Sequence, residues 1–414
     1  MVRGMADGGL LLSGTGRLLM AQPHAAAPAG TISPWAVLIR EGRIGWVGSP
    51  DEAPAADQFE DLGTGLVSPG LVDAHTHPVF AGDRSDEAAA RLEGQPYEAG
   101  GILRTVAATR QAADDDLHEL VAGRLRASLA GGTTTVEAKS GYGLTTAEEL
   151  RALRIIGAAG TAVGMRVVRT FLGAHAVPPE ATSAAEYVET VISDMLPAVA
   201  GHADFCDVFC DRGFFTPAQA EAILTAAKGH DMGLRLHAEQ LARTGAAELG
   251  VRMGAASVDH LEQLDQPGVA ALAGSATVAT LLPGPALAMR GGLPPARALL
   301  DAGASVALAT DTNAGTYANP SMPLVIGLGA TVLQMTVQEA VAAATAGGAA
   351  AIGLSHEIGL IREGMAADLV AWDAEHEGAF ALRMGAVHPN RIWIGGEERV
   401  LGGLFTRMAR ELAR

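Results

Sequence analysis

Histidine and aspartate side chains follow apolar runs at several separate places in the chain. His75 and His77 end the run GLVDAHTH, and side chains two positions apart on a strand lie on the same face, so both imidazoles can reach one metal ion. His237, His260 and Asp311 each end a further apolar run. Imidazole and carboxylate ligands suit Zn²⁺ or an iron ion, and a catalytic site of this kind keeps one position open for water. These five side chains predict a transition-metal site.

An isolated histidine on an apolar strand is more often a hydrogen-bonded core residue than a metal ligand, and a lone His-x-His pair is common by chance. In this chain, candidate ligands recur at the ends of four separate runs. A shared metal site explains that recurrence with one cause, whereas core histidines would need an independent cause on each run. We therefore prefer the metal site.

The metal-site candidates belong to a longer series of apolar runs, and helical segments such as residues 115–130 and 216–230 lie between several of them. The second of these segments begins at a Thr cap followed by Pro, which is typical of a helix start. Strand and helix alternating eight times indicate an α/β fold, the parallel (β/α)8 barrel of the TIM type, whose strand carboxyl ends carry the chemistry. The eight runs are GLVDAHTH, TTTVEAKS, RVVRTFLGAH, DFCDVFCD, LRLHAEQ, SVDHLEQ, TVATLLPG and SVALATDTN.

Both ends of the chain have a different pattern. Residues 1–66 hold short apolar runs broken by Gly, Pro and Asp, and similar runs, ADLVAWD and NRIWIGGEERVL, follow an Ala-rich helical stretch near the other end. Such runs are typical of short strands joined by tight turns. We expect residues 1–66 and 361–414 to pair into one small β domain, with the barrel formed by residues 67–360.

Composition excludes several classes of protein. The 29 Lys and Arg residues against 46 Asp and Glu give a net charge of −17, which argues against a nucleic-acid partner. The chain is 49% hydrophobic, yet no run reaches the roughly 18 apolar residues of a membrane helix. Cys206 and Cys210 are too few for a disulfide framework, so we expect them to be buried thiols. We expect a soluble cytoplasmic protein with no membrane partner.

Six motifs carry a resemblance to a known family: PGLVDAHTH, EAKSGYGLT, FLGAH, LHAEQL, DHLEQL and ATDTNAGT. Together they resemble the imidazolonepropionase family of the amidohydrolase superfamily, enzymes that open the imidazolone ring in histidine degradation. The resemblance implies a metal-dependent barrel with a β-sandwich built from both termini, and a homodimer. It also implies hydrolysis of the cyclic amide C–N bond of 4-imidazolone-5-propanoate to N-formimidoyl-L-glutamate. The residues that match the family's metal ligands are His75, His77, His237 and Asp311.

The resemblance also implies the residues that serve the substrate. Asp311 can accept a proton from water and pass it to the departing ring nitrogen, while His260 can polarise the carbonyl, so both are candidate catalytic residues. The propionate is an anion that meets a protein of charge −17, so a local cation such as Arg84 must offset the unfavourable field. The residues that match substrate-binding positions are Arg84, Tyr97, Tyr142, His175, Gln240, Asn313, Gly315 and Thr316.

We expect one metal ion per chain. Binuclear members of the superfamily bridge two metals with a carbamylated lysine at the end of the fourth strand, but here the fourth run ends in DVFCD. Lys139, on the second run, is the lysine at a strand end. It could act as an ion partner near the ligands or hold the turn KSGYGL, and the sequence leaves both roles open.

Two loops depart from the family pattern. After Tyr97 the sequence EAGGIL is shorter than expected, and LLPGPALAMRGG after the seventh run lacks the expected aromatic residues. These departures keep a second hypothesis open, an amidohydrolase or deaminase that acts on another small heterocycle. A third hypothesis is a non-catalytic scaffold of the same fold, which loss of the ligands would mark. None of the five candidate ligand and catalytic positions is lost.

Overall fold

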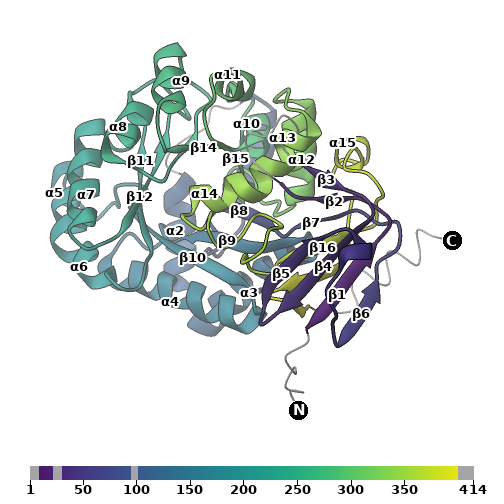
Figure 1. The fold of residues 1–414 in the computed structure, drawn as a ribbon. Helices are drawn as coiled ribbons and strands as arrows, with labels where there is room; N and C mark the ends of the chain where they lie inside the picture. The colour runs from purple at the N-terminus through teal and green to yellow at the C-terminus, as the bar shows by residue number, and fades with distance from the viewer. Residues whose placement is uncertain (1–8, 22–29, 95–100, 400–414) are drawn as a thin grey trace.

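The computed structural model describes residues 9–21, 30–94 and 101–399. Its largest sheet has eight strands in the order β15-β14-β13-β12-β11-β10-β9-β8, all parallel. A parallel bridge between Thr76 and Thr312 closes the sheet into a barrel with helices around its outside (Figure 1). The predicted (β/α)8 barrel is confirmed. Its strands are β8 (Leu71–Thr76), β9 (Thr133–Lys139), β10 (Arg166–Ala174), β11 (Phe205–Cys210), β12 (Gly233–Ala238), β13 (Ser257–His260), β14 (Val278–Leu281) and β15 (Val306–Leu308).

Several helices around the barrel begin at a residue whose side chain accepts a hydrogen bond from a backbone N–H of the first turn, namely α4, α5, α7, α9, α12 and α13. In α7 the Thr216 hydroxyl accepts from the backbone of Gln219, whose side chain accepts in return from the backbone of Thr216. The segments predicted as helices are α3 and α7. The helices of the barrel are α1 (Ser85–Leu92), α2 (Gly101–Gln111), α3 (Asp114–Ala130), α4 (Thr146–Val163), α5 (Ala184–Thr190), α6 (Leu196–Val199), α7 (Pro217–Lys228), α8 (Ala246–Met253), α9 (Gln266–Ala273), α10 (Pro283–Ala288), α11 (Ala296–Asp301), α12 (Met322–Thr331), α13 (Val337–Ala342) and α14 (Gly348–Ala351).

Two further sheets have the strand orders β5-β4-β1-β6 and β18-β17-β16-β7-β2-β3. The first contains only strands from the N-terminal part of the described chain, and the second combines strands from both ends. Trp35 of the first sheet and Trp393 of the second share one apolar core, so the sheets pack on each other as a β-sandwich (Figure 1). The division at residues 66 and 360 stays a prediction. The strands are β1 (Leu10–Gly14), β2 (Leu18–Leu19), β3 (Thr31–Ile32), β4 (Trp35–Arg40), β5 (Arg43–Gly48), β6 (Gln58–Asp61), β7 (Val67–Pro69), β16 (Leu369–Trp372), β17 (Pro389–Ile394) and β18 (Glu397–Glu398).

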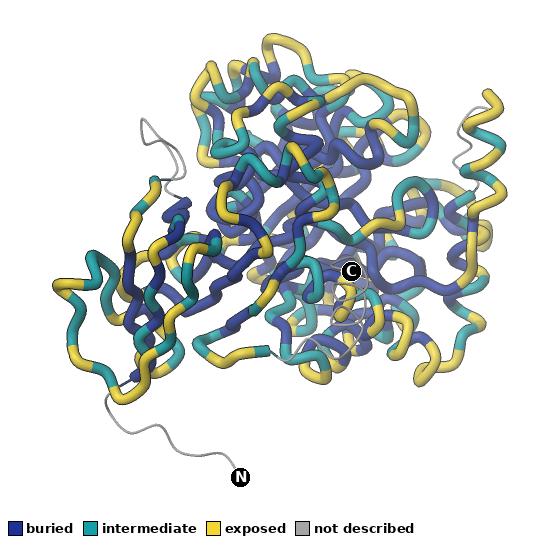
Figure 2. The backbone as a smooth tube through the Cα atoms, turned by 90° about the vertical axis from the view of Figure 1, so that its right-hand side faces the viewer, coloured by how far each residue is buried: buried dark blue, intermediate teal, exposed yellow. Residues whose placement is uncertain are grey.

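The barrel strands form the interior of the molecule, and Figure 2 shows buried backbone at the centre with exposed loops around it. Cys206 and Cys210 are free thiols on β11, both buried in the apolar core, as expected. Within the described ranges, no helix has the length and apolar character needed to cross a membrane.

Candidate active site

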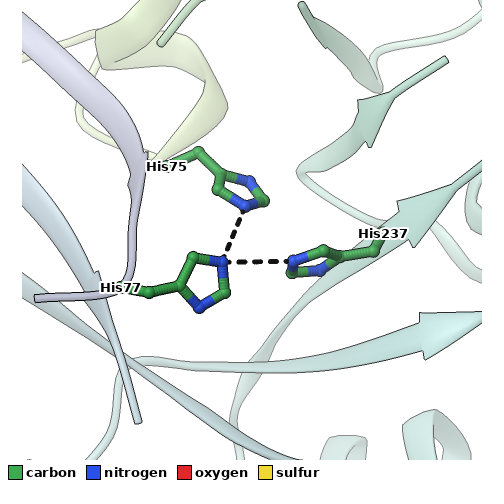
Figure 3. A group of neighbouring side chains, drawn as sticks. All are labelled: His75, His77 and His237. Carbon is green, nitrogen blue, oxygen red and sulfur yellow. Dashed lines mark hydrogen bonds between the residues drawn. The ribbon is translucent and has the colours of Figure 1, made fainter. Parts of the chain in front are cut away.

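Three imidazoles converge at the carboxyl ends of β8 and β12 (Figure 3). The Nε2 atom of His77 lies 3.2 Å from Nε2 of His75 and 3.4 Å from Nε2 of His237. Asp311, just beyond β15, places Oδ1 3.4 Å from Nε2 of His77 and 3.6 Å from Nε2 of His75. All four side chains are buried. The barrel therefore brings together the four side chains predicted as metal ligands.

The outer nitrogens of two of these imidazoles are held by buried carboxylates. Nδ1 of His75 lies 2.7 Å from Asp259, and Nδ1 of His237 lies 3.1 Å from Asp207. When Nδ1 carries the proton and donates it to a carboxylate in a hydrogen bond, Nε2 is unprotonated and has a free lone pair. This tautomer binds a metal through Nε2.

Burial disfavours the protonated form of these rings, and it lowers the pKa of His75 and of His77 well below the ordinary histidine value. Neutral imidazoles and a carboxylate, all aimed at one point, fit a Zn²⁺ or iron ion. The residues present therefore fit the metal that the sequence predicts.

Asp311 and His260 occupy strained backbone. Their φ angles are 50° and 84°, in the left-handed region that side-chain-bearing residues rarely adopt. Burial raises the pKa of Asp311 to about 7. Residues keep such a strained backbone conformation only where the surrounding structure holds it in place, and residues of this kind cluster at functional sites.

His260 has a carboxylate partner that the sequence did not indicate. Its Nδ1 lies 3.4 Å from Oε1 of Glu262. Burial opposes protonation of His260, but the Glu262 and Asp311 carboxylates raise its pKa above the ordinary value. His260 can therefore donate a hydrogen bond from Nε2 to a nearby oxygen.

Arg84 lies in the loop between β8 and α1, with its side chain only 2% exposed. Its Nε and Nη2 donate to Oε2 of Glu87 at 3.0 and 2.7 Å. A Cβ at Gly315 would lie 2.4 Å from Nη1 of Arg84, and one at Gly101 would lie 2.0 Å from Nη2. Glycine at both positions lets the guanidinium lie in the wall of the site.

The loop after β9 carries Tyr142 and is held by one buried carboxylate. Glu149 accepts hydrogen bonds from the backbone of Gly141 and Gly143 at 2.9 Å and from Leu144 at 2.7 Å. The carbonyl of Gly141 in turn lies 2.9 Å from Nδ1 of His175, whose pKa burial lowers to about 3. A neutral His175 that donates through Nδ1 presents Nε2 as a hydrogen-bond acceptor.

One pocket gathers most of the predicted site residues. Asn313 shapes its rim, because its Oδ1 accepts from the backbone of Gly315 and Thr316 at 2.8 Å. Ile102 and Phe209 also line the pocket, and the sequence did not single them out. Tyr97 lies outside the described residues. The predicted residues that line the pocket are His77, Arg84, Tyr142, His175, Gln240, His237, His260, Asp311, Asn313, Gly315 and Thr316.

Known proteins match this chain over most of its length. Residues 66–399 match the sequence profile of the Amidohydrolase family. The imidazolonepropionase of Saccharopolyspora erythraea is 46% identical over 370 residues, which cover 89% of this chain and 94% of that protein. The imidazolonepropionase of Salinispora tropica is 47% identical over 380 residues, with 91% and 95% covered. The chain belongs to the imidazolonepropionase family of the amidohydrolases.

Solved structures support the same fold. A triazine hydrolase variant matches with a TM-score of 0.76 at 19% identity, covering 98% of both chains. An adenosine deaminase from Xanthomonas campestris with bound zinc matches with a TM-score of 0.72 at 19% identity, covering 98% of this chain and 97% of that one.

Membership of the imidazolonepropionase family makes this chain a hydrolase of the amidohydrolase superfamily, so the hypothesis of a non-catalytic scaffold is wrong.

The loop after β14, which lacks the aromatic residues expected there, has an aromatic neighbour. A Cβ at Gly284 would lie 2.5 Å from the ring of Tyr317, which comes from the loop after β15. An aromatic ring therefore packs beside this loop although the loop has none of its own.

Proposed function

We propose that this enzyme hydrolyses 4-imidazolone-5-propanoate to N-formimidoyl-L-glutamate in histidine degradation. The observation that carries the proposal is that buried Arg84 lines the same pocket as His77, His237 and Asp311. Nε2 of the fourth proposed ligand, His75, lies 3.2 Å from Nε2 of His77. A substrate with a carboxylate at one end and a hydrolysable ring at the other matches such a pocket. The names of the relatives at 46 and 47% identity support the same substrate.

The proposed metal ligands are His75, His77, His237 and Asp311. A divalent or trivalent ion there, Zn or Fe, supplies Lewis-acid chemistry that lowers the pKa of water to roughly 7 and so makes hydroxide available at neutral pH. We expect elemental analysis to find one metal ion per active chain. Two ions per active chain would contradict the proposed mononuclear site.

Asp311 is the proposed proton carrier. The oxygen of water forms a bond to the ring carbonyl carbon, and the carboxylate of Asp311 accepts the proton that the water loses. As the C–N bond breaks, Asp311 returns that proton to the departing ring nitrogen, so the atoms and charges balance. His260, beside Asp311, donates a hydrogen bond to the carbonyl oxygen as negative charge develops on it.

The remaining pocket residues orient the substrate. Arg84 pairs with the propionate, and the acceptor Nε2 of His175 matches an N–H of the ring. Tyr142 and Gln240 are proposed as further hydrogen-bonding groups for the ring. Asn313, Gly315, Thr316 and Tyr97 complete the proposed substrate-binding set.

Replacing Arg84 by Met is expected to raise KM by about 10- to 150-fold. The reason is the loss of a charge-assisted hydrogen bond worth about 1.5 to 3 kcal/mol, while kcat and metal content stay near their starting values. Steady-state kinetics with metal analysis measures this. Arg126→Met is the control, because Arg126 pairs with another acidic side chain, Glu119, but is 54% exposed and does not line the pocket. An unchanged KM for Arg84→Met would exclude Arg84 from the site and reopen the choice of substrate.

The proposed reaction is tested with 4-imidazolone-5-propanoate and metal-analysed protein. We expect N-formimidoyl-L-glutamate as product and no release of ammonia. Ammonia release from this or another heterocycle would favour a deaminase instead. The homodimer and the cytoplasmic location are part of the same proposal and rest on the family resemblance and the sequence composition.

A further inference from the structure

Lys139 ends β9, and its side chain is fully buried. Its Nζ donates to Oε1 of Glu137 and to Oδ2 of Asp207, both at 2.8 Å, and lies 3.9 Å from Oδ2 of Asp259. Burial disfavours its charge, but Asp207 and Glu137 hold the pKa of Lys139 above the ordinary lysine value. Lys139 is therefore a charged ammonium inside the barrel.

The two aspartates near Lys139 are the ones that hold the metal-site histidines. Asp207, on β11, binds Nδ1 of His237, and Asp259, on β13, binds Nδ1 of His75. The Lys139 ammonium therefore lies near both carboxylate–histidine pairs, Asp207 with His237 and Asp259 with His75, whose members come from four different strands.

The carboxylates depend on this ammonium to different degrees. Asp259 has a second cation, because Nη2 of Arg235 donates to it at 2.9 Å. Among the described residues, Lys139 is the only lysine or arginine with a side-chain nitrogen within 4.0 Å of a carboxylate oxygen of Asp207. A buried carboxylate without a cation costs several kcal/mol, so removal of Lys139 affects Asp207 most.

The turn KSGYGL does not need Lys139. The backbone N–H groups of Gly141, Gly143 and Leu144 donate to Glu149, and the Lys139 ammonium contacts strand residues instead. Of the two roles that the sequence left open for Lys139, the structure favours that of ion partner.

We propose that Lys139 is a positioning residue of the metal centre, which anchors Asp207 and Asp259 so that His237 and His75 keep their protons on Nδ1 and their Nε2 lone pairs on the metal. The inference rests on the proposed metal ligands and does not depend on the proposed substrate. Loss of an outer partner of a metal ligand typically costs 10- to 100-fold in metal affinity. Lys139 acts through the aspartates and touches neither metal nor substrate.

The test uses the full chain reconstituted with Co²⁺. We expect Lys139→Met to bind Co²⁺ about 10- to 100-fold more weakly, measured by competition with a chelator, and to shift its visible absorption bands. Glu149→Gln is the control, because Glu149 is also a buried ionisable side chain on the barrel, but among the described residues it accepts hydrogen bonds from backbone N–H groups of the loop after β9 and from no metal ligand. Its Co²⁺ affinity and spectrum are expected to stay unchanged. Co²⁺ affinity and bands in Lys139→Met equal to those of the unmodified enzyme would overturn the proposal and leave Lys139 a purely structural role.

Lys139→Met leaves the buried site one positive charge short and can fail to fold. The double variant Lys139→Met/Glu137→Gln removes one charge of each sign and keeps both aspartates, and we expect the same loss of Co²⁺ affinity from it. In the unmodified metal-free protein, ¹⁵N NMR of the imidazole rings is expected to find His75 and His237 protonated on Nδ1. Protonation of either ring on Nε2 alone would overturn the proposal without any variant. None of these measurements uses the substrate, so a negative substrate assay beside positive Co²⁺ results would reject the proposed substrate only.

Discussion

Asp311→Asn is expected to lower kcat by at least about 100-fold while the protein keeps much of its metal. Asparagine retains a coordinating oxygen and the shape of the side chain, but it cannot accept the proton of the attacking water. The fold should tolerate the change, because Asp311 has a φ of 50° and asparagine adopts this left-handed conformation readily. The backbone bonds of Asp311 to His75 and to the Asn313 side chain are also retained.

The measurement is kcat at saturating substrate together with metal per chain. A lower kcat in a metal-free Asn variant would indicate that Asp311 acts through ligation alone. A variant with full metal and near-normal turnover would contradict the role of Asp311 as proton carrier. His260, which lies beside Asp311 and is paired with Glu262, would then be the next candidate for the base.

The barrel could be predicted because its signal is local. Each strand is an apolar run that ends in a polar residue, and the run SVALATDTN predicted β15 and the site at Asp311 although the strand spans only Val306–Leu308. Helix starts were equally local where a cap was present, as at Thr216. The pairing of β16 with β7 was predicted only as an association of the two termini, because its register depends on contacts between residues about 300 positions apart.

The cluster of His75, His77, His237 and Asp311 could be predicted because these residues lie at or just beyond strand ends, where the barrel brings side chains from different strands to one place. Asp207 and Asp259 were missed because they lie within apolar runs, and a single sequence does not show which distant histidine each one meets. A signal was present, since carboxylates are rarely buried without a partner. DFCDVFCD and SVDH each place an aspartate among apolar residues, which already indicates a buried partner for it.

Glu262, Ile102 and Phe209 had weaker signals. The pairing of Glu262 with His260 depends on the unusual backbone at His260 and Leu261, with φ angles of 84° and 71°, which no residue type in this segment predicts. Ile102 reaches the pocket from α2 because of how that helix packs over the barrel, not because of its own sequence pattern. Phe209 has the composition of a core residue and lines the pocket because β11 is the strand beside His237.

His77→Ala is expected to abolish activity and most metal binding together. Nε2 of His77 lies 3.2 Å from Nε2 of His75 and 3.4 Å from Nε2 of His237. The substitution therefore removes the proposed ligand that contacts both other histidines, and it leaves only His75, His237 and Asp311 to hold the metal. Among the described residues, Nδ1 of His77 has no hydrogen-bond partner, so the substitution disrupts no bond to that atom. His77→Ala and His175→Ala each remove one buried imidazole, so we expect the metal-free forms of these two variants to unfold at similar temperatures.

The matched control for His77→Ala is His175→Ala. The two rings stack with centroids 5.2 Å apart, so both substitutions remove an imidazole from the same wall of the pocket. His175 is held by the carbonyl of Gly141 and is proposed to contact only substrate, so His175→Ala should retain its metal while KM rises. Elemental analysis and thermal unfolding of both variants separate these outcomes. A His77→Ala protein with a full complement of metal would remove His77 from the ligand set, and the centre would then have to be built from the neighbouring group of His75, His260 and Asp311.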